Sequence, residues 1–238
     1  MEEFTEDPLH WHLFSDEFYD KIQSRLEDPN ELDDGGYTLL HVAAWSRVGN
    51  SRITQLLLER GADVHSTTPH GHTPLHFAVC SRKRDTGVAL IEAGASVNSE
   101  DFLGRTALHF SVCKRWPHPQ SPILHIACDM WIVKRLLCDP GIILNPVDET
   151  GETPLMWAVK ERNWKAVRAL LKKGVNPNIP NEDNRTPLHV ALSARNPSYD
   201  IVIALLICGA GIYCEDKFRQ RESLVGRRHF PLLTPCEK

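Results

Sequence analysis

The sequence lacks any run of about 18 consecutive apolar residues, the length that a helix needs to cross a bilayer. It also lacks an apolar stretch after its acidic start, Met1-Glu2-Glu3, so we expect no secretory signal. Charge of neither sign dominates the 238 residues, because 27 Lys and Arg stand against 31 Asp and Glu. These absences favour a protein of the cytoplasm, or of the nucleus, that binds neither membrane nor nucleic acid.

Catalytic motifs are missing as well. The chain contains no H-E-x-x-H, G-x-G-x-x-G, G-x-x-x-x-G-K-[ST] or G-x-S-x-G pattern. The seven cysteines are odd in number and no two form a C-x-x-C pair, which argues against a disulfide framework and for reduced thiols. We therefore expect no catalytic residue, no cofactor and no structural disulfide.

What the chain does contain is a repeat. One tetrapeptide occurs five times, and its threonines are 35, 33, 47 and 33 residues apart. Small apolar residues follow each copy, and then a leucine-rich stretch and a glycine. The five copies are Thr38-Leu39-Leu40-His41, Thr73-Pro74-Leu75-His76, Thr106-Ala107-Leu108-His109, Thr153-Pro154-Leu155-Met156 and Thr186-Pro187-Leu188-His189.

The chemistry of this box predicts the start of a helix. The threonine hydroxyl can accept a hydrogen bond from an unpaired backbone N–H of the first turn. Proline suits that turn, because its φ is already helical and it has no N–H to leave unpaired. The glycine after the leucines, such as Gly61, Gly141 or Gly174, can take a positive φ and end a second helix. Each repeat is therefore predicted to be a pair of short helices.

This fivefold pattern resembles the ankyrin repeat, whose box is Thr-Pro-Leu-His-x-Ala. The resemblance implies an all-α repeat solenoid of stacked helix-turn-helix ankyrin repeats, with β-hairpin or loop fingers between them. It also implies that the box histidine links neighbouring turns by hydrogen bonds, so that Met156 weakens the junction of the fourth repeat. Residues 1–32 are interpreted as a degenerate N-terminal capping repeat, and 215–238 as a partial C-terminal cap and tail. The five repeats between them are predicted at 33–67, 68–100, 101–147, 148–180 and 181–214.

The third repeat is longer because of an insertion at about 114–126. Prolines at 117, 119 and 122 prevent the first helix from continuing through it. We favour a protruding loop followed by an extended second helix, and a partly duplicated repeat is the alternative. A cleft near this insertion is also where an enzyme or enzyme accessory would have its site, which is the second functional hypothesis.

Two groups of side chains have the chemistry of zinc ligands. The first contains the box histidine His76, which already has a structural role, and two histidines that flank the tip glycine Gly71. The spacing of the second matches no zinc motif, so we expect no metal at either. The groups are His70, His72 and His76, and Cys113, His118, His125 and Cys128.

Partners of ankyrin repeats usually lie on the concave face, which is built by the finger tips and the exposed side of each first helix. Carried onto this sequence, the resemblance implies a contact surface that is aromatic in its N-terminal half and charged in its C-terminal half. Exposed aromatic side chains favour a binding hot spot, although Trp45 or Phe102 could instead pack against a neighbouring repeat. The implied partner-binding residues are Tyr37, Trp45, His70, His72, Phe102, Leu103, Arg105, Lys114, Trp116, Glu149, Glu152, Lys160 and Arg185.

The remaining tryptophans, Trp131, Trp157 and Trp164, are expected in the core or between repeats. The sequence thus predicts a monomeric, non-catalytic module that binds another protein as an adaptor, scaffold or inhibitor. A third hypothesis is that the chain is a fragment of a larger multidomain protein whose other parts carry the activity.

Overall fold

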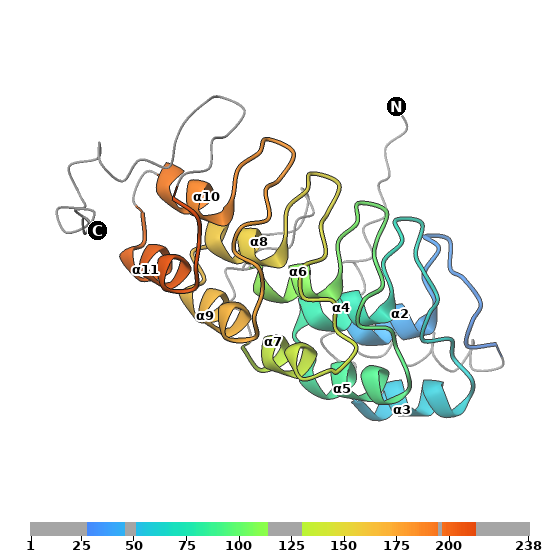
Figure 1. The fold of residues 1–238 in the computed structure, drawn as a ribbon. Coiled ribbons are helices and arrows are strands. Elements are labelled where there is room, and N and C mark those ends of the chain that lie inside the picture. The colour runs from blue at the N-terminus through green and yellow to red at the C-terminus, as the bar shows by residue number, and fades with distance from the viewer. Residues whose placement is uncertain (1–27, 46–50, 114–129, 195–196, 213–238) are drawn as a thin grey trace, which may run out of the picture. The chain divides into compact units, whose positions relative to one another are not determined.

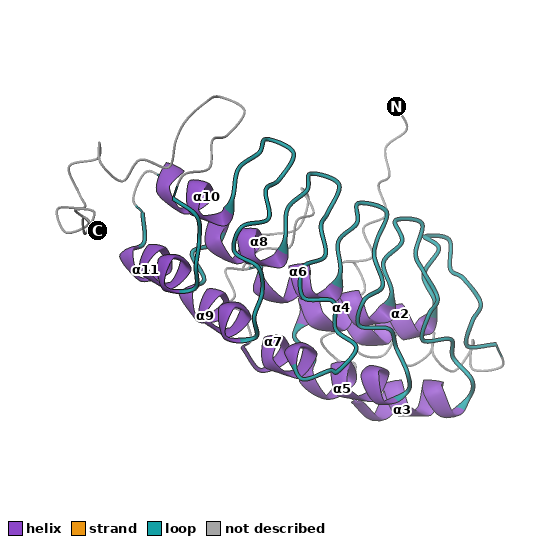
Figure 2. Cartoon of the chain, in the orientation of Figure 1, coloured by secondary structure: helices purple, strands orange, loops and turns teal. Residues whose placement is uncertain are grey.

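The computed structural model describes residues 28–45, 51–113, 130–194 and 197–212, and ten helices lie within these ranges (Figure 1). The described residues contain no strand, only one isolated antiparallel bridge between Glu100 and Thr106 (Figure 2). The helices are α2 (Leu39–Trp45), α3 (Ser51–Glu59), α4 (Pro74–Ser81), α5 (Arg84–Glu92), α6 (Ala107–Val112), α7 (Met130–Leu137), α8 (Pro154–Lys160), α9 (Trp164–Lys172), α10 (Pro187–Ser193) and α11 (Tyr199–Ile207).

Each predicted repeat holds one pair of helices, which confirms the all-α repeat fold. The fingers between the pairs are loops, and the β-hairpin form is not found among the described residues. The insertion at 114–126 lies outside the described residues, and so do most of the predicted N-terminal cap and all of the predicted C-terminal cap and tail.

The chain divides into two compact units, residues 1–143 and 144–238. In the first unit, α2 packs on α4 and α4 on α6, while α3 packs on α5 and α5 on α7. In the second unit, α8 packs on α10 and α9 on α11. Each unit is therefore a stack in which first helices form one layer and second helices form another (Figure 1).

The box residues begin the first helices as the sequence predicts. In α4, Thr73 is the N-cap and Pro74 is the first helical residue, and the Thr73 backbone N–H donates to His76 Nδ1 at 3.0 Å. The same reciprocal capping box occurs at Thr106 and at Thr186. At Thr153, where the box has Met156, the threonine hydroxyl accepts the Met156 N–H at 3.3 Å. The helix start therefore survives the loss of the histidine.

One leucine from each helix fills the core. The box leucine of every first helix and one leucine of every second helix have an exposed fraction of at most 1%. Burying such a side chain contributes roughly 1.5–3 kcal/mol, so these residues hold each helix pair together. They are Leu40, Leu75, Leu108, Leu155 and Leu188 on the first helices, and Leu57, Leu90, Leu136, Leu170 and Leu205 on the second.

The glycines after the second helices behave as predicted with one exception. Gly61, Gly94, Gly174 and Gly209 have φ values of 83° to 92°. Gly141 has no positive φ, so the prediction for the third repeat is wrong. This glycine lies one residue further from the leucine pair, where its N–H donates to the Asp139 carboxylate at 3.0 Å.

Asparagine side chains join consecutive repeats at these turns. Asn98 donates to the Gly141 carbonyl at 2.7 Å and accepts from the Ile143 N–H at 2.8 Å. Asn178 makes the same pair of bonds with Gly209 and Gly211. Asn30 repeats the pattern with Gly61 at 3.1 Å and with the Asp63 N–H at 2.7 Å.

Asn30 therefore occupies the place of a repeat-ending asparagine ahead of the first box. It precedes Gly61 by 31 residues, as Asn178 precedes Gly209. Sequence reasoning missed this residue, and the shared spacing was the signal that could have found it. The bond ties the segment before the first repeat to the loop that follows α3.

Candidate partner-binding surface

Five finger loops, residues 33–37, 68–72, 101–105, 148–152 and 181–185, precede the first helices and share one geometry. In each loop the backbone N–H of the first residue donates to the carbonyl of the fifth. The side chain of the first residue accepts the N–H of the fifth, for example Arg105 N–H to Asp101 Oδ1 at 2.9 Å. The fifth residues are Tyr37, His72, Arg105, Glu152 and Arg185, so five predicted site residues occupy equivalent positions at the base of a finger.

Neighbouring fingers are joined through their backbones. The Phe102 N–H donates to the His70 carbonyl at 3.1 Å, and the Glu182 N–H donates to the Thr150 carbonyl at 3.1 Å. Gly71 allows the first contact, because a Cβ on this residue would lie 2.8 Å from the Phe102 nitrogen. These two pairs of neighbouring fingers are thus held in register by direct hydrogen bonds.

The first unit presents an apolar tip on its own fingers. Phe102 is 75% exposed, and Leu103 and His70 are exposed beside it along the fingers. The Phe102 ring lies against Gly71 of the preceding finger but keeps most of its surface exposed. The three predicted residues Phe102, Leu103 and His70 form what we call the finger-tip patch.

Tyr37 and Trp45 are placed differently. Both are half-buried, and their rings meet the Phe77 ring edge-on with centroids 5.9 and 5.8 Å away. Phe77 belongs to the next repeat, so the alternative of packing between repeats is the right one for Trp45, and Tyr37 packs in the same way. Their main structural role is to support the junction of α2 with α4.

A buried ion cluster lies behind the finger-tip patch. The Asp101 side chain is fully buried, and its Oδ2 lies 2.7 Å from Arg105 Nη2 and 3.2 Å from His72 Nε2. Burial alone would raise the pKa of Asp101, but hydrogen bonds from His72 and Arg105 more than offset it and hold this pKa well below its usual range. The Arg105 guanidinium also lies over the Phe110 ring, 5.0 Å from its centroid. His72 and Arg105 are therefore fixed in place by Asp101.

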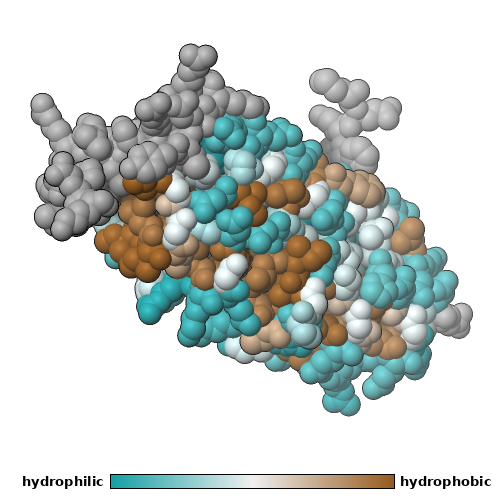
Figure 3. Space-filling view, viewed as in Figure 1, coloured by the Kyte–Doolittle hydropathy of each residue, from teal (hydrophilic) through white to brown (hydrophobic). Residues whose placement is uncertain are grey.

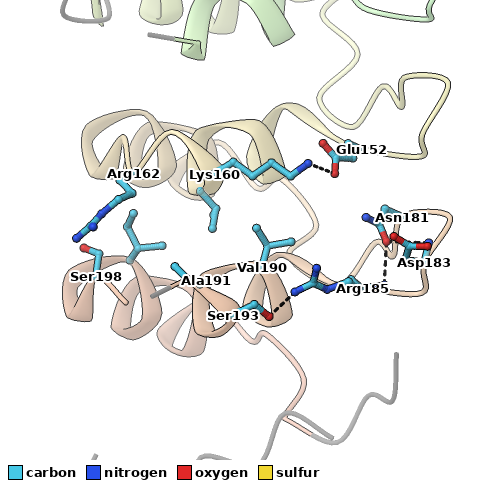
Figure 4. Close-up of a pocket in the computed structure, with 13 residues that line it drawn as sticks. Glu152, Lys160, Arg162, Asn181, Asp183, Arg185, Val190, Ala191, Ser193 and Ser198 are labelled. Atoms are coloured by element: carbon cyan, nitrogen blue, oxygen red, sulfur yellow. Dashed lines mark hydrogen bonds and ion pairs between the residues drawn. The ribbon is translucent and has the colours of Figure 1, made fainter. Parts of the chain in front are cut away.

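The second unit carries a groove of about 360 Å³ on its finger side, lined by both charged and apolar side chains (Figure 4). Its walls include Glu152, which forms an ion pair with Lys160, and Arg185, which donates to the Ser193 hydroxyl. Each pair joins a finger to the end of the first helix of the same repeat (Figure 4). Three predicted residues thus meet at this groove, while Glu149 lies exposed on the finger above Glu152.

Comparison with known proteins agrees with this architecture. A family model described as ankyrin repeats, in three copies, matches residues 40–118 and 124–216, which is more than half of the chain. The chain belongs to the ankyrin repeat family. Members of this family are generally protein-interaction modules without catalytic activity.

The curated relatives contain the same repeats within longer proteins. Neurogenic locus notch homolog protein 1 from Homo sapiens is 29% identical over 164 residues, and the protein of that name from Xenopus tropicalis is 30% identical over 165 residues. Each alignment covers 68% of this chain but only 6% of the relative. A transient receptor potential cation channel, subfamily A member 1, from Homo sapiens is 39% identical over 54 residues, 23% of this chain and 5% of that protein.

Two predicted residues of the ankyrin surface, Lys114 and Trp116, lie outside the described residues. Three tryptophans were expected in the core or between repeats, and none is fully buried. Trp131 and Trp164 are exposed on second helices, and Trp157 is half-buried with its Nε1–H donating to Asp148 Oδ2 at 2.9 Å. Arg84 of the preceding repeat nevertheless lies over the Trp131 ring, 6.0 Å from its centroid, and Trp164 lines a groove shared with α11 of the next repeat. Trp164 lies six residues before the buried Leu170, and this spacing was the sequence signal for its outward position.

The first candidate zinc group is brought together only in part. The rings of His70 and His72, and those of His72 and His76, have centroids 6.1 Å apart. No group of three His, Cys, Asp or Glu side chains within the described ranges has the geometry to hold a metal ion. The second group lies mostly outside those ranges. Among the helices that the structure describes, none has both the length and the apolar character to span a membrane.

Proposed function

We propose that this ankyrin array binds a partner protein on its finger side, with the finger-tip patch as the main contact. The observation that carries the proposal is Phe102, a large aromatic side chain that is three-quarters exposed on a loop fixed at both ends. Exposed aromatic residues on a rigid surface are typical of binding hot spots. Binding without chemistry suits an adaptor, scaffold or inhibitor in the cytoplasm or nucleus, acting as a monomer.

Rigidity of the fingers supports this proposal. Asp101 fixes its own loop by accepting the Leu103 and Arg105 N–H groups, each at 2.9 Å. The next finger back is tied to the same loop by the His70–Phe102 bond. A surface that is already ordered loses less conformational entropy on binding, so more of the contact free energy appears as affinity.

The charged groove of the second unit has a different part in the proposal. Lys160 is exposed and Arg185 is half-buried, while Glu152 is buried in its ion pair with Lys160. Charges at such a partly solvated rim add more to partner selection and association rate than to affinity. Glu149 extends this charged row on the same finger. We propose that these residues select the partner and set its orientation.

The proposal is tested by replacing Phe102 and Leu103 together with serine in the full chain. Quantitative affinity purification from the native cell extract should then recover at least about tenfold less of the partners that the wild-type chain enriches. The matched control is Gln55→Ser, an exposed change on α3, which should leave recovery unchanged. If the double variant keeps its far-UV circular dichroism and still recovers the same proteins, the finger-tip patch is not the contact.

A further inference from the structure

The second helices carry a second, unexpected surface. Counted from the buried leucine of each second helix, the residues six and two positions before it and two positions after it face outward. In α11 these are Tyr199, Ile203 and Ile207, with exposed fractions of 50%, 51% and 79%. The corresponding residues are Ser51, Gln55 and Glu59 at α3, Arg84, Val88 and Glu92 at α5, Met130, Lys134 and Cys138 at α7, and Trp164, Arg168 and Lys172 at α9. Only α11 is aromatic or aliphatic at all three positions.

This stripe borders a groove between α9 and α11, within the second unit. The groove has a volume of about 670 Å³. Its lining includes Ile203 and Ile207 from α11, and Trp164, Arg168 and Lys172 from α9. Figure 3 shows a largely hydrophobic surface at the place of α11. Asp200 is the one acidic side chain on the lining. The α11 side of the groove is thus apolar apart from Asp200, and the α9 side combines apolar side chains with two cations.

We propose that this groove docks an amphipathic helix of a partner protein, with an apolar face and an acidic flank. Three apolar side chains spaced four residues apart form a ridge, against which the ridges of an incoming helix can pack. Arg168 and Lys172 stand exposed beside that ridge, so acidic residues on the incoming helix would lie opposite two cations. This surface belongs to the second-helix layer, so the groove is a site separate from the finger-tip patch.

Charge argues against the C-terminal residues of this chain as the occupant, whereas residues 1–27, with eight Asp and Glu against two Lys and Arg, carry the opposite sign and are tested by the alkylation experiment below. Residues 213–238 contain six Lys and Arg against four Asp and Glu, the same sign as the α9 wall. A second copy would bring another Arg168 and Lys172 to the same rim, where like charges repel. An anionic vesicle would complement Arg168 and Lys172, but its surface would not fill the groove between α9 and α11. An acidic helix satisfies both the shape and the charge.

The binding test uses the full chain and a fluorescein-labelled helical peptide of about 18 residues, with Leu on one face and Glu on the other. Fluorescence anisotropy should show binding that weakens as salt is added, and the matching Leu/Lys peptide should bind at least about tenfold more weakly. Ile203→Glu with Ile207→Glu, and separately Arg168→Glu with Lys172→Glu, should each raise Kd about tenfold or more. Gln55→Glu, at the position of Ile203 on α3, is the matched control and should leave Kd unchanged.

Two exposed cysteines provide an independent readout. Cys208 lines the groove, while Cys138 lies outside it, after α7 in the first unit. Saturating Leu/Glu peptide should slow alkylation of Cys208 about fivefold or more, read by peptide mapping, and leave Cys138 unchanged.

Four outcomes would overturn the proposal. They are equal binding of the two peptides, unchanged Kd in the α9 and α11 variants, vesicle binding with no peptide binding, and a Cys208 that is already unreactive in the free chain. The last outcome would mean that this chain, or a second copy, already covers the groove. Because the substituted side chains are exposed, the variants are expected to fold, and circular dichroism checks that they do.

Discussion

At the scale of single residues, the box histidines His41 and His76 are structural groups held neutral. His41 Nδ1 accepts the Thr38 N–H at 3.2 Å, so its proton lies on Nε2, which donates to the His72 carbonyl at 3.0 Å. Burial lowers the pKa of His41 to about 4, and burial followed by repulsion from His72 lowers that of His76 to about 3. A proton added to either ring would place a positive charge in a buried site, where it loses its hydration.

The first residue-scale prediction concerns pH. The unfolded chain binds protons on these rings near pH 6.5 and the folded chain does not, so stability is full above pH 6.5 and falls toward pH 4. We expect His41 to account for a loss of about 2 kcal/mol between pH 8 and pH 5. Urea unfolding at the two pH values measures the loss. His41→Gln should reduce this loss of unfolding free energy, and His65→Gln, at an exposed position, should not. An equal loss between pH 8 and pH 5 in all three proteins would contradict the assignment to His41.

The second residue-scale prediction concerns thiol reactivity. Burial, and after it the neighbouring Cys113, raises the pKa of the Cys80 thiol well above its ordinary value. Because the thiolate is the reacting form, Cys80 should be alkylated at least about tenfold more slowly than the exposed Cys138 or Cys208. Timed alkylation followed by peptide mapping measures all three rates in one sample. A Cys80 that reacts as fast as Cys138 would contradict this account.

The residue scale is also where sequence reasoning stopped short. His72 and Arg105 were each predicted to face a partner, from their places in neighbouring fingers. The structure joins them through Asp101, although His72 and Arg105 are 33 residues apart in the chain. No local pattern marks Asp101 as their shared partner, because that contact exists only once two repeats are stacked.

At the scale of elements, the helix pairs were predictable and the loops between them only in part. Thr, Pro, Leu and Gly at fixed spacing determine where first helices begin and where most second helices end. Gly141 does not take the predicted positive φ because it lies one residue further from the leucine pair than the other glycines. Trp164 is exposed because it occupies an outward-facing position of α9. The contact between fingers depends on how repeats stack, which spacing alone does not give.

That contact can be tested at Gly71. Gly71 has φ 80°, and an added Cβ would lie 2.8 Å from the Phe102 nitrogen. Gly94 has φ 92° but open space around the same position. Both alanine variants pay the cost of a left-handed backbone, about 1–2 kcal/mol, and Gly71→Ala should lose a further 1–3 kcal/mol or so. Urea unfolding measures the difference, and equal losses would show that the fingers are not in close contact.

At the scale of the whole molecule, the chain combines a common architecture with two distinct surfaces. The ankyrin fold explains why no single catalytic centre is needed, because binding uses surfaces that several repeats build together. The finger-tip patch is apolar and lies on rigid loops that precede first helices. The α9–α11 groove is apolar and basic and lies on second helices. Length and charge predicted neither surface, since both depend on which positions each repeat turns outward.

Site-specific photo-crosslinking tests the central claim most directly. The photoreactive residue p-benzoylphenylalanine replaces Phe102 in one variant of the 238-residue chain and Gln55 in another, and both are irradiated in the native cell extract. Protein binding on the finger side predicts a discrete crosslinked species from position 102 that is absent from position 55. Crosslinks that are equal at both positions, or found only at position 55, would contradict it.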